Sequence, residues 1–201
     1  MIKQIPIGPM MNFAYLIGDD SSKVCAAVDP AWNAPEIARV AEESGWKIVK
    51  ILLTHSHYDH INALEALAET TGAEVYVHTA DAEGLPPGVD ARRTEEGSEI
   101  EIGSLTARCI HTPGHTLGSQ CFLVDGALIT GDTLFVDNCG RVDLPESSPK
   151  QMIQSLARLA KLNPSTVVYP GHDYGPSPTS TIGAQVKSNP YLNAGHGDEL
   201  L

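Results

Sequence analysis

The feature that most constrains this chain is a dense group of metal-binding side chains in the run Thr54-His55-Ser56-His57-Tyr58-Asp59-His60. Three imidazoles and one carboxylate form a ligand set that suits zinc or a similar first-row metal. On a helix, side chains meet when they are three or four residues apart, so the rings of His55 and His57 would diverge. The group is therefore predicted to lie on a loop, where tight turns can direct several side chains inward.

The segments on either side predict where that loop lies in a sheet. Residues 47–53 form a short β-branched apolar run, which is typical of a buried strand. Residues 61–71 are rich in Ala, Leu and Glu, which favours a helix. The group would then lie at the carboxyl end of a strand, where open α/β sheets place their ligands.

The rest of the chain predicts strands and helices in a similar order. Helices are expected at 34–44, after the cap residue Asn33, and at 148–162. The segment 81–96, rich in Gly, Pro and charge, is predicted to be an exposed loop over the site. Further strands are expected at 13–17, 24–28, 74–78, 99–102, 105–110, 120–124, 127–130 and 166–169. We expect one domain of the α/β (α+β) class over residues 1–201, with two mixed sheets, helices outside and a loose tail at about 193–201.

Composition and charge exclude several classes of function. The formal net charge is −12, from 25 acidic and 13 basic residues, and no basic run is longer than Arg92-Arg93. Such a chain is a poor candidate for binding nucleic acid or an anionic membrane. No apolar run reaches transmembrane length, Met1 to Gly8 lacks the pattern of a secretion signal, and the four cysteines are scattered. Reduced thiols and a cytoplasmic location are expected.

Three other predicted strands end in a Gly-containing turn with a metal-binding side chain. His115 follows the strand at 105–110, Asp132 follows the strand at 127–130, and His172 follows the strand at 166–169. Glycine lets the backbone bend tightly at each of these points. Each segment alone is typical of an ordinary turn, but four such strand ends in one chain indicate a shared site.

These segments together resemble the metallo-β-lactamase superfamily of hydrolases. His55-Ser56-His57-Tyr58-Asp59-His60 is similar to the family's H-x-H-x-D-H motif. Three later motifs follow in the family's order: Pro113-Gly114-His115-Thr116, Gly131-Asp132 and Pro170-Gly171-His172. The resemblance covers the chain from about Asn12 to Leu192 and implies a four-layer αββα sandwich, the metallo-β-lactamase fold, with the site at one edge between the sheets.

The resemblance also implies ligands for two divalent metal ions, with zinc expected and iron or manganese as alternatives. For one metal the implied ligands are His55, His57 and His115. For the other they are Asp59, His60 and His172, and Asp132 bridges the two. A hydroxide bridging the metals would attack an ester, thioester, amide or phosphoester, and Asp59 would act as a catalytic residue that orients it.

Within the superfamily, the segment from Gly131 to Arg141 resembles glyoxalase II, the hydroxyacylglutathione hydrolases, and especially their short bacterial relatives. In that group a basic residue after Cys-Gly contacts a substrate carboxylate. The resemblance implies that Arg141 binds a small-molecule, carboxylate-bearing thioester; the competing interpretation is a salt bridge to Asp143. The missing C-terminal helical extension, and Asp143 where an aromatic residue is expected, leave glutathione dependence open.

A second family shares the same letters. Gly140-Arg141-Val142-Asp143 and His172-Asp173-Tyr174 also resemble persulfide dioxygenases, which hold one iron and oxidise glutathione persulfide. That resemblance implies a single iron on His55, His115 and Asp132. The ligand motifs are common to both families, so the sequence leaves a mononuclear-iron dioxygenase as the alternative to a hydrolase, and it leaves the oligomeric state open.

Four residues outside the motifs have weaker signals. Asp29, at the end of the strand at 24–28, is expected to support a ligating histidine. Tyr174 is a candidate for the pocket wall. His78 and His111 are expected to be ordinary strand-end residues.

Overall fold

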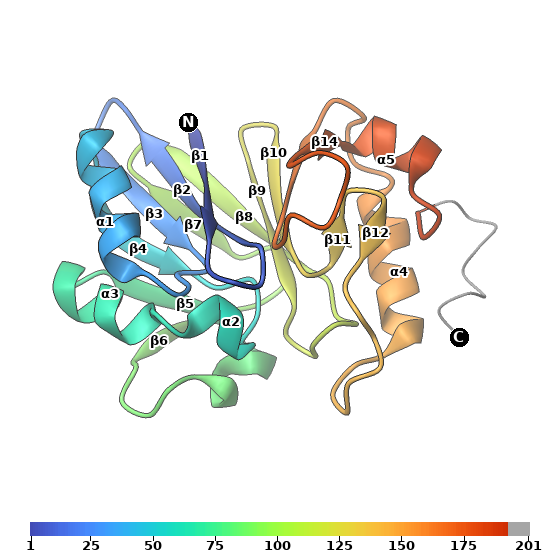
Figure 1. The fold of residues 1–201 in the computed structure, drawn as a ribbon, viewed down its shortest axis with the longest axis horizontal. Helices are drawn as coiled ribbons and strands as arrows, with labels where there is room; N and C mark the ends of the chain where they lie inside the picture. Colours follow the sequence, from blue (N-terminus) through green and yellow to red (C-terminus); the bar gives the residue numbers. More distant parts are fainter. Residues whose placement is uncertain (193–201) are drawn as a thin grey trace.

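The fold, seen in a computed structural model that describes residues 1–192, is built from two six-stranded sheets with helices on their outer sides (Figure 1). The strand order is β1-β2-β3-β4-β5-β6 in the first sheet and β14-β13-β10-β9-β8-β7 in the second. Each sheet contains both parallel and antiparallel pairs. The predicted four-layer αββα sandwich is confirmed.

The first sheet comprises β1 (Ile2–Ile7), β2 (Asn12–Asp19), β3 (Val24–Val28), β4 (Lys47–Leu52), β5 (Glu74–His78) and β6 (Ala91–Thr94). The second comprises β7 (Glu99–Ile102), β8 (Leu105–His111), β9 (Gln120–Val124), β10 (Ala127–Gly131), β13 (Val167–Pro170) and β14 (Ser180–Thr181). A small ribbon of β11 (Leu134–Phe135) and β12 (Asn138–Cys139) stands apart from both sheets.

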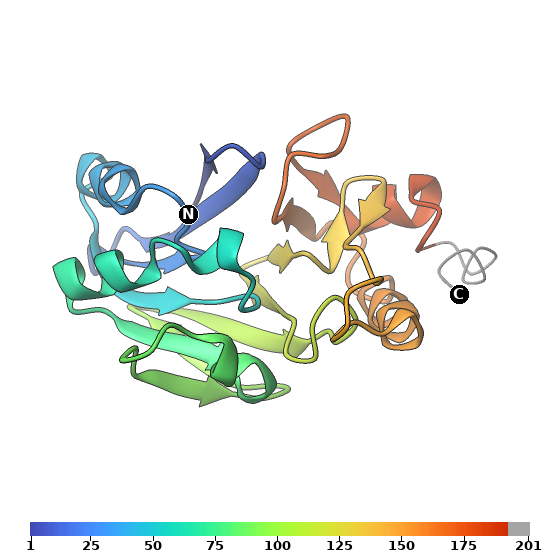
Figure 2. The ribbon, with the colours of Figure 1, turned by 60° about the horizontal axis from the view of Figure 1, so that its bottom comes forward.

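The helices divide between the two outer faces, as Figures 1 and 2 show. On the side of the first sheet lie α1 (Ala34–Glu43), the one-turn helix α2 (Tyr58–Ile61), α3 (Leu64–Thr71) and the 3-10 helix η1 (Thr79–Gly84). On the side of the second lie α4 (Pro149–Leu159) and α5 (Ile182–Ser188). None of the helices in residues 1–192 has the length and hydrophobicity that crossing a bilayer requires.

Three apolar clusters fill the three spaces between the four layers. The strands of the first sheet alternate between two of them: Ala14 and Leu16 of β2 pack with the α1 and α3 side, while Phe13 and Tyr15 face the second sheet. This period of two is the pleat of a strand that is buried on both faces. The third cluster lies between the second sheet and α4, around residues such as Leu128. Because both sheets are covered on both faces, the open edge of the sandwich is where a site can reach solvent.

Two helix starts agree with the predictions from the sequence. Asn33 caps α1 by accepting a hydrogen bond from the Glu36 backbone N–H, and Gly45 follows the helix with a φ of +73°. Ser148 caps α4 in the same way through Gln151. Both helices are therefore ended and oriented by local sequence signals.

Three predictions about the site and its surroundings were wrong. The helix expected at 61–71 is split into α2 and α3, because the Asn62 side chain bonds the Trp32 N–H and the Ala63 N–H bonds the Pro30 carbonyl. Asp59 and His60 therefore lie on α2 rather than on a loop. The segment predicted as an exposed loop at 81–96 contains part of η1 and the strand β6, which pairs with β5. The tail predicted at about 193–201, with His196, lies outside the described residues.

Candidate metal centre

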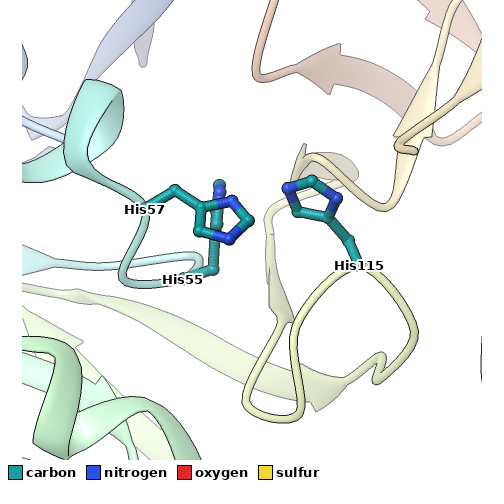
Figure 3. Close-up of side chains that lie close together, drawn as sticks. All are labelled: His55, His57 and His115. Carbon is teal, nitrogen blue, oxygen red and sulfur yellow. The ribbon is translucent and has the colours of Figure 1, made fainter. Parts of the chain in front are cut away.

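Four strand ends bring their side chains to one edge of the sandwich. His55 and His57 follow β4, His115 follows β8, and their candidate ligand atoms lie within 4.8 Å of one another. Figure 3 shows the rings of His55 and His57 facing that of His115 across the gap between the two loops. A second group with the same spacing consists of Asp59, His60 and His172. The fold thus brings together residues that are up to 117 positions apart, from 55 to 172.

Asp132 lies between the two groups. Its Oδ1 is 3.3 Å from His60 Nε2, and its Oδ2 is 3.5 Å from His115 Nε2 and 3.4 Å from His172 Nε2. One carboxylate therefore faces histidines of both groups, which is the position of a bridging ligand.

Each of the five histidines has one ring nitrogen held by a hydrogen bond, at 2.8–3.0 Å, and turns the other nitrogen toward the centre of the site, where the Nε2 atoms of His60 and His172 lie 3.1 Å from each other. The Nδ1 atoms of His115 and His172 donate to the backbone carbonyls of Arg141 and Met10. The acceptors for His55, His57 and His60 are Thr54 Oγ1, Glu146 Oε1 and Asp29 Oδ2. Metal-ligating histidines are oriented by bonds of this kind, which fix the tautomer that leaves a lone pair for the metal.

Among residues 1–192, three buried polar atoms at the centre of the site have no hydrogen-bond partner: His55 Nε2, His115 Nε2 and Asp132 Oδ1. Buried polar atoms in folded proteins are almost always paired. Two imidazole lone pairs and a carboxylate oxygen share one kind of partner, a cation such as zinc, iron or manganese. The residues therefore fit a metal ion.

Asp29 supports two of the histidines, as expected from its place after β3. Its Oδ1 accepts from the Thr54 N–H at 2.8 Å, and its Oδ2 accepts from Thr54 Oγ1 at 2.6 Å and from His60 Nδ1 at 3.0 Å. Thr54 Oγ1 in turn accepts from His55 Nδ1. Because both oxygens of Asp29 are used in this way, it orients ligands rather than serving as one.

The site is a strongly coupled set of charges. Burial would lower the pKa of His172, but its hydrogen bonds to Asp132 and Asp59 raise it to about 9. Burial would raise the pKa of Asp132, but His60 and His172 hold it well below its usual range. Burial and the neighbouring His60 lower the pKa of His55. Metal binding requires neutral imidazoles, so it displaces protons that the cluster otherwise holds.

Two glycines let the loops approach this closely. Gly131 has a φ of +48°, and a Cβ there would lie 2.3 Å from Thr54 Oγ1. A Cβ on Gly171 would lie 2.3 Å from Asp132 Oδ1. The glycine before Asp132 and the glycine before His172 are therefore required by packing.

A cavity of about 460 Å³ opens onto the metal-binding residues. Its wall includes Tyr174, so the prediction that this residue lines the pocket is confirmed. The other lining side chains outside the metal-binding set are Met10, Tyr58, Phe135, Asn138, Cys139, Arg141 and Leu144. Outside the metal-binding set, the described part of the wall is thus largely apolar, and Arg141 is its basic side chain.

Arg141 contributes to this wall in two ways. Its carbonyl orients His115, and its guanidinium forms a bidentate salt bridge with Asp143 at 2.7 and 2.9 Å. The side chains of both partners are about two-thirds exposed, at 64% and 67%. The interpretation of Arg141 as the partner of Asp143 is therefore the arrangement seen, and the fork that would hold a substrate carboxylate is filled by Asp143.

Several supporting contacts could not be predicted from the sequence. Glu146 bonds His57 from a distance of 89 positions along the chain, and the Met10 carbonyl bonds His172. Asp81, expected in an exposed loop, is buried and bonds both histidine-bearing loops. His78 and His111, expected to be ordinary strand-end residues, stack on each other with ring centroids 3.9 Å apart.

Comparison with known proteins agrees with this geometry. Residues 7–172 match the metallo-beta-lactamase superfamily, and the chain belongs to that superfamily of metal-dependent hydrolases. The probable polyketide biosynthesis zinc-dependent hydrolase BaeB of Bacillus velezensis is 36% identical, over 90% of this chain and 81% of its own length. The hydroxyacylglutathione hydrolase of Rhodospirillum rubrum is 44% identical over 81% of this chain. The match spans only 62% of that relative's length.

Solved structures show the same fold. ETHE1 from Myxococcus xanthus matches with a TM-score of 0.90 at 29% identity, covering 100% of this chain and 88% of that one. TTHA1623, solved in a di-iron-bound form, matches with a TM-score of 0.82 at 32% identity, covering 94% of this chain and 100% of that one. Proteins of this superfamily typically bind two divalent metal ions.

Proposed function

We propose that this protein is a thioester hydrolase of the hydroxyacylglutathione type that uses two divalent metal ions, with zinc as the first choice. The observation that carries the proposal is the arrangement of the five histidines: each is held at one ring nitrogen and presents the other to a centre shared with Asp59 and Asp132. A metal site requires imidazoles that are oriented in this way, by a hydrogen bond at the ring nitrogen that faces away from the metal.

The two groups define the proposed ligand sets. His55, His57 and His115 would hold one ion, Asp59, His60 and His172 would hold the other, and Asp132 would contribute to both. When bound, such a pair of ions supplies Lewis-acid polarisation and a water whose pKa is lowered to about 7. Asp59 is fixed by Asn12, whose Nδ2 donates to Asp59 Oδ2 at 2.9 Å. We assign Asp59 the task of orienting the attacking water toward the thioester carbonyl.

The pocket supports a substrate with an apolar part and one carboxylate. Met10, Tyr58 and Tyr174 line it and are among the exposed large hydrophobic residues, at 46%, 73% and 49%. Partly exposed apolar side chains at a pocket mouth favour an acyl thioester with an apolar arm. Arg141, the basic residue in the lining, would bind a carboxylate by its planar fork after exchanging Asp143 for it.

The relatives support hydrolysis of this kind. Hydroxyacylglutathione hydrolases 38–44% identical match 81% of the chain. The zinc-dependent hydrolases of polyketide biosynthesis cover more of it, at 90%. We further propose that the chain forms one domain. A cytoplasmic location is proposed because all four cysteines are free, buried thiols.

A second candidate, a persulfide dioxygenase with one iron, is favoured by one specific observation. The three buried atoms without a partner belong to two histidines and one carboxylate, His55, His115 and Asp132. Two histidines and a carboxylate with open positions are the ligand set of mononuclear non-haem iron oxygenases. The same atoms also belong to the two-metal set, so they do not replace the first proposal.

Two assays on one preparation separate the candidates. The protein is loaded with zinc or with iron(II), and hydrolysis of S-D-lactoylglutathione is followed beside oxygen uptake with glutathione persulfide. We expect metal-dependent thioester cleavage that Asp59→Asn abolishes, without oxygen uptake. Oxygen uptake by the iron form, without thioester cleavage, would replace our proposal with the second candidate.

A further inference from the structure

We propose that Asp81 is a positioning residue that holds the two loops carrying His55, His57 and His115 at a fixed separation. This proposal rests on the proposed function only in assuming that these histidines bind metal. Asp81 lies on η1, outside the metal-binding set and outside the pocket wall.

The carboxylate of Asp81 bonds both loops at once. Its Oδ2 accepts from the Ser56 N–H at 3.0 Å and from Thr116 Oγ1 at 2.9 Å, and its Oδ1 accepts from the Gly118 N–H at 2.6 Å. Ser56 lies between His55 and His57, and Thr116 directly follows His115. Gly118 lies on the same loop as Thr116, so the three donors come from the two histidine-bearing loops, which follow strands of different sheets.

Close packing fixes the carboxylate in this position. The residue is only 6% exposed. A Cβ on Gly118 would lie 2.4 Å from Asp81 Oδ1, and a Cβ on Gly84 would lie 2.4 Å from Ser56 Oγ. Glycine at these two points lets η1 and the second loop close around Asp81 and Ser56. These two glycines are therefore required by close packing and not only by the turn of the chain.

The three hydrogen bonds require a carboxylate at this position. A buried carboxylate is costly unless hydrogen bonds compensate it, and here all three donors come from the histidine-bearing loops. An asparagine in its place would turn an NH₂ group toward at least one of these donors. The loops would then separate or leave a buried N–H without a partner.

The other group of metal-binding residues is supported independently. His60 is held by Asp29, and His172 is held by the Met10 carbonyl. Neither contact involves η1. Loss of the Asp81 carboxylate should therefore weaken the ion bound by His55, His57 and His115 and leave the other ion largely unaffected.

The test is a zinc titration of metal-free Asp81→Asn protein in competition with a chromophoric chelator. We expect one binding step to weaken about 10- to 100-fold, the range for loss of a residue that supports a ligand, and the other to stay within about threefold. Glu83→Gln is the matched control, since it removes the same charge from an exposed position of the same helix. In cobalt(II)-substituted protein, Asp81→Asn should change the visible absorption bands, and Glu83→Gln should not.

Zinc affinities equal to those of the wild type, with unchanged cobalt bands, would overturn the proposal. If Asp81→Asn does not fold, Thr116→Ala removes one of the three bonds and should weaken the same step by about 2- to 10-fold; no weakening would equally overturn it. The outcome is independent of the substrate. A wild-type protein that binds zinc but cleaves no thioester would contradict the proposed function and leave this comparison intact.

Discussion

At the scale of single residues, Asp29 links two metal-binding histidines, His60 directly and His55 through Thr54. Asp29→Asn should lower zinc affinity about 10- to 100-fold, because one amide group cannot accept all three hydrogen bonds. Competition with a chelator measures the effect. Asp90→Asn, an exposed position with the same change in charge, serves as the control. Unchanged affinity in Asp29→Asn would contradict the supporting role.

Substitutions of Arg141 and Asp143 are expected to change KM in opposite directions. Arg141→Ala should raise KM about 10-fold for a carboxylate-bearing thioester, because a charge-assisted hydrogen bond is lost. Asp143→Asn should lower KM about threefold, because the exposed salt bridge that competes for the guanidinium is removed. Steady-state kinetics with a thioester lacking the carboxylate is the control, and neither variant should change its KM. If Arg141→Ala leaves both KM values unchanged, Arg141 does not bind substrate.

The sequence predicted the residues of the centre and one supporting residue, Asp29, but not the other supports. His55 to His60, His115, Asp132 and His172 stand in short motifs, so their residue types and order were informative. The Met10 carbonyl carries no side-chain signal, and Glu146 contacts His57 only because the fold brings together positions 89 apart. Outer contacts of this kind depend on tertiary structure and are invisible to a motif.

At the scale of elements, the helix α4 is set by its cap. Ser148 Oγ accepts from the Gln151 N–H, and the Ser148 N–H donates to the Gly114 carbonyl just before His115. Ser148→Ala should lower the free energy of unfolding by about 1 kcal/mol, the usual effect of losing an N-cap side chain. Urea unfolding measures it, with Lys150→Ala in the same turn as the control. A loss no larger than that of the control would contradict the capping role.

Helices and strands with a regular pattern of apolar residues were predicted well. Strands that are defined only by their hydrogen bonds to a neighbouring strand were not. The cap residues and apolar runs identified α1, α4 and most strands. Three strands escaped because they are two residues long: β11, β12 and β14. The strand β1 was also missed: it contains Pro6, and proline is tolerated in a sheet mainly on an edge strand. The strand β6 was missed because its exposed pair Arg92-Arg93 is typical of a loop, and only the pairing with β5 makes it a strand.

At the scale of the whole molecule, Asp19 joins the two sheets. Its carboxylate accepts from Ser22 and Ser21 at the β2–β3 turn and from the Ser104 N–H at the β7–β8 turn. These bonds, that from Ser22 first, hold the pKa of Asp19 well below its ordinary value. The carboxylate thus stabilises the contact between the turns of the two sheets.

A pH dependence follows from the direction of that shift. A carboxyl group whose pKa is lower in the folded state stabilises the fold above its unfolded pKa of about 3.9, and the contribution is lost as the pH falls below it. Metal-free Asp19→Asn should therefore be less stable than the wild type near neutral pH, and the gap should narrow below about pH 3.9. Urea unfolding of both proteins across this range measures it. A gap that is constant with pH would contradict the role of the ionised carboxylate.

The arrangement of layers was predictable from the sequence because each layer has its own apolar period. The site followed from that arrangement, because its residues lie in the segments after four strands, and the sandwich brings the ends of these strands to one edge (Figure 1). The number of bound metal ions could not be predicted from the sequence, because the H-x-H-x-D-H motif occurs in both families. The three buried atoms without a partner are compatible with one ion or with two.

The metal content of the purified protein tests the central claim most directly. Elemental analysis by mass spectrometry, set against the protein concentration, gives the number and identity of the ions per chain. Our account predicts two divalent ions per chain, with zinc foremost, shared through Asp132. A protein that holds a single iron, and takes up no second ion when zinc is supplied, would contradict it.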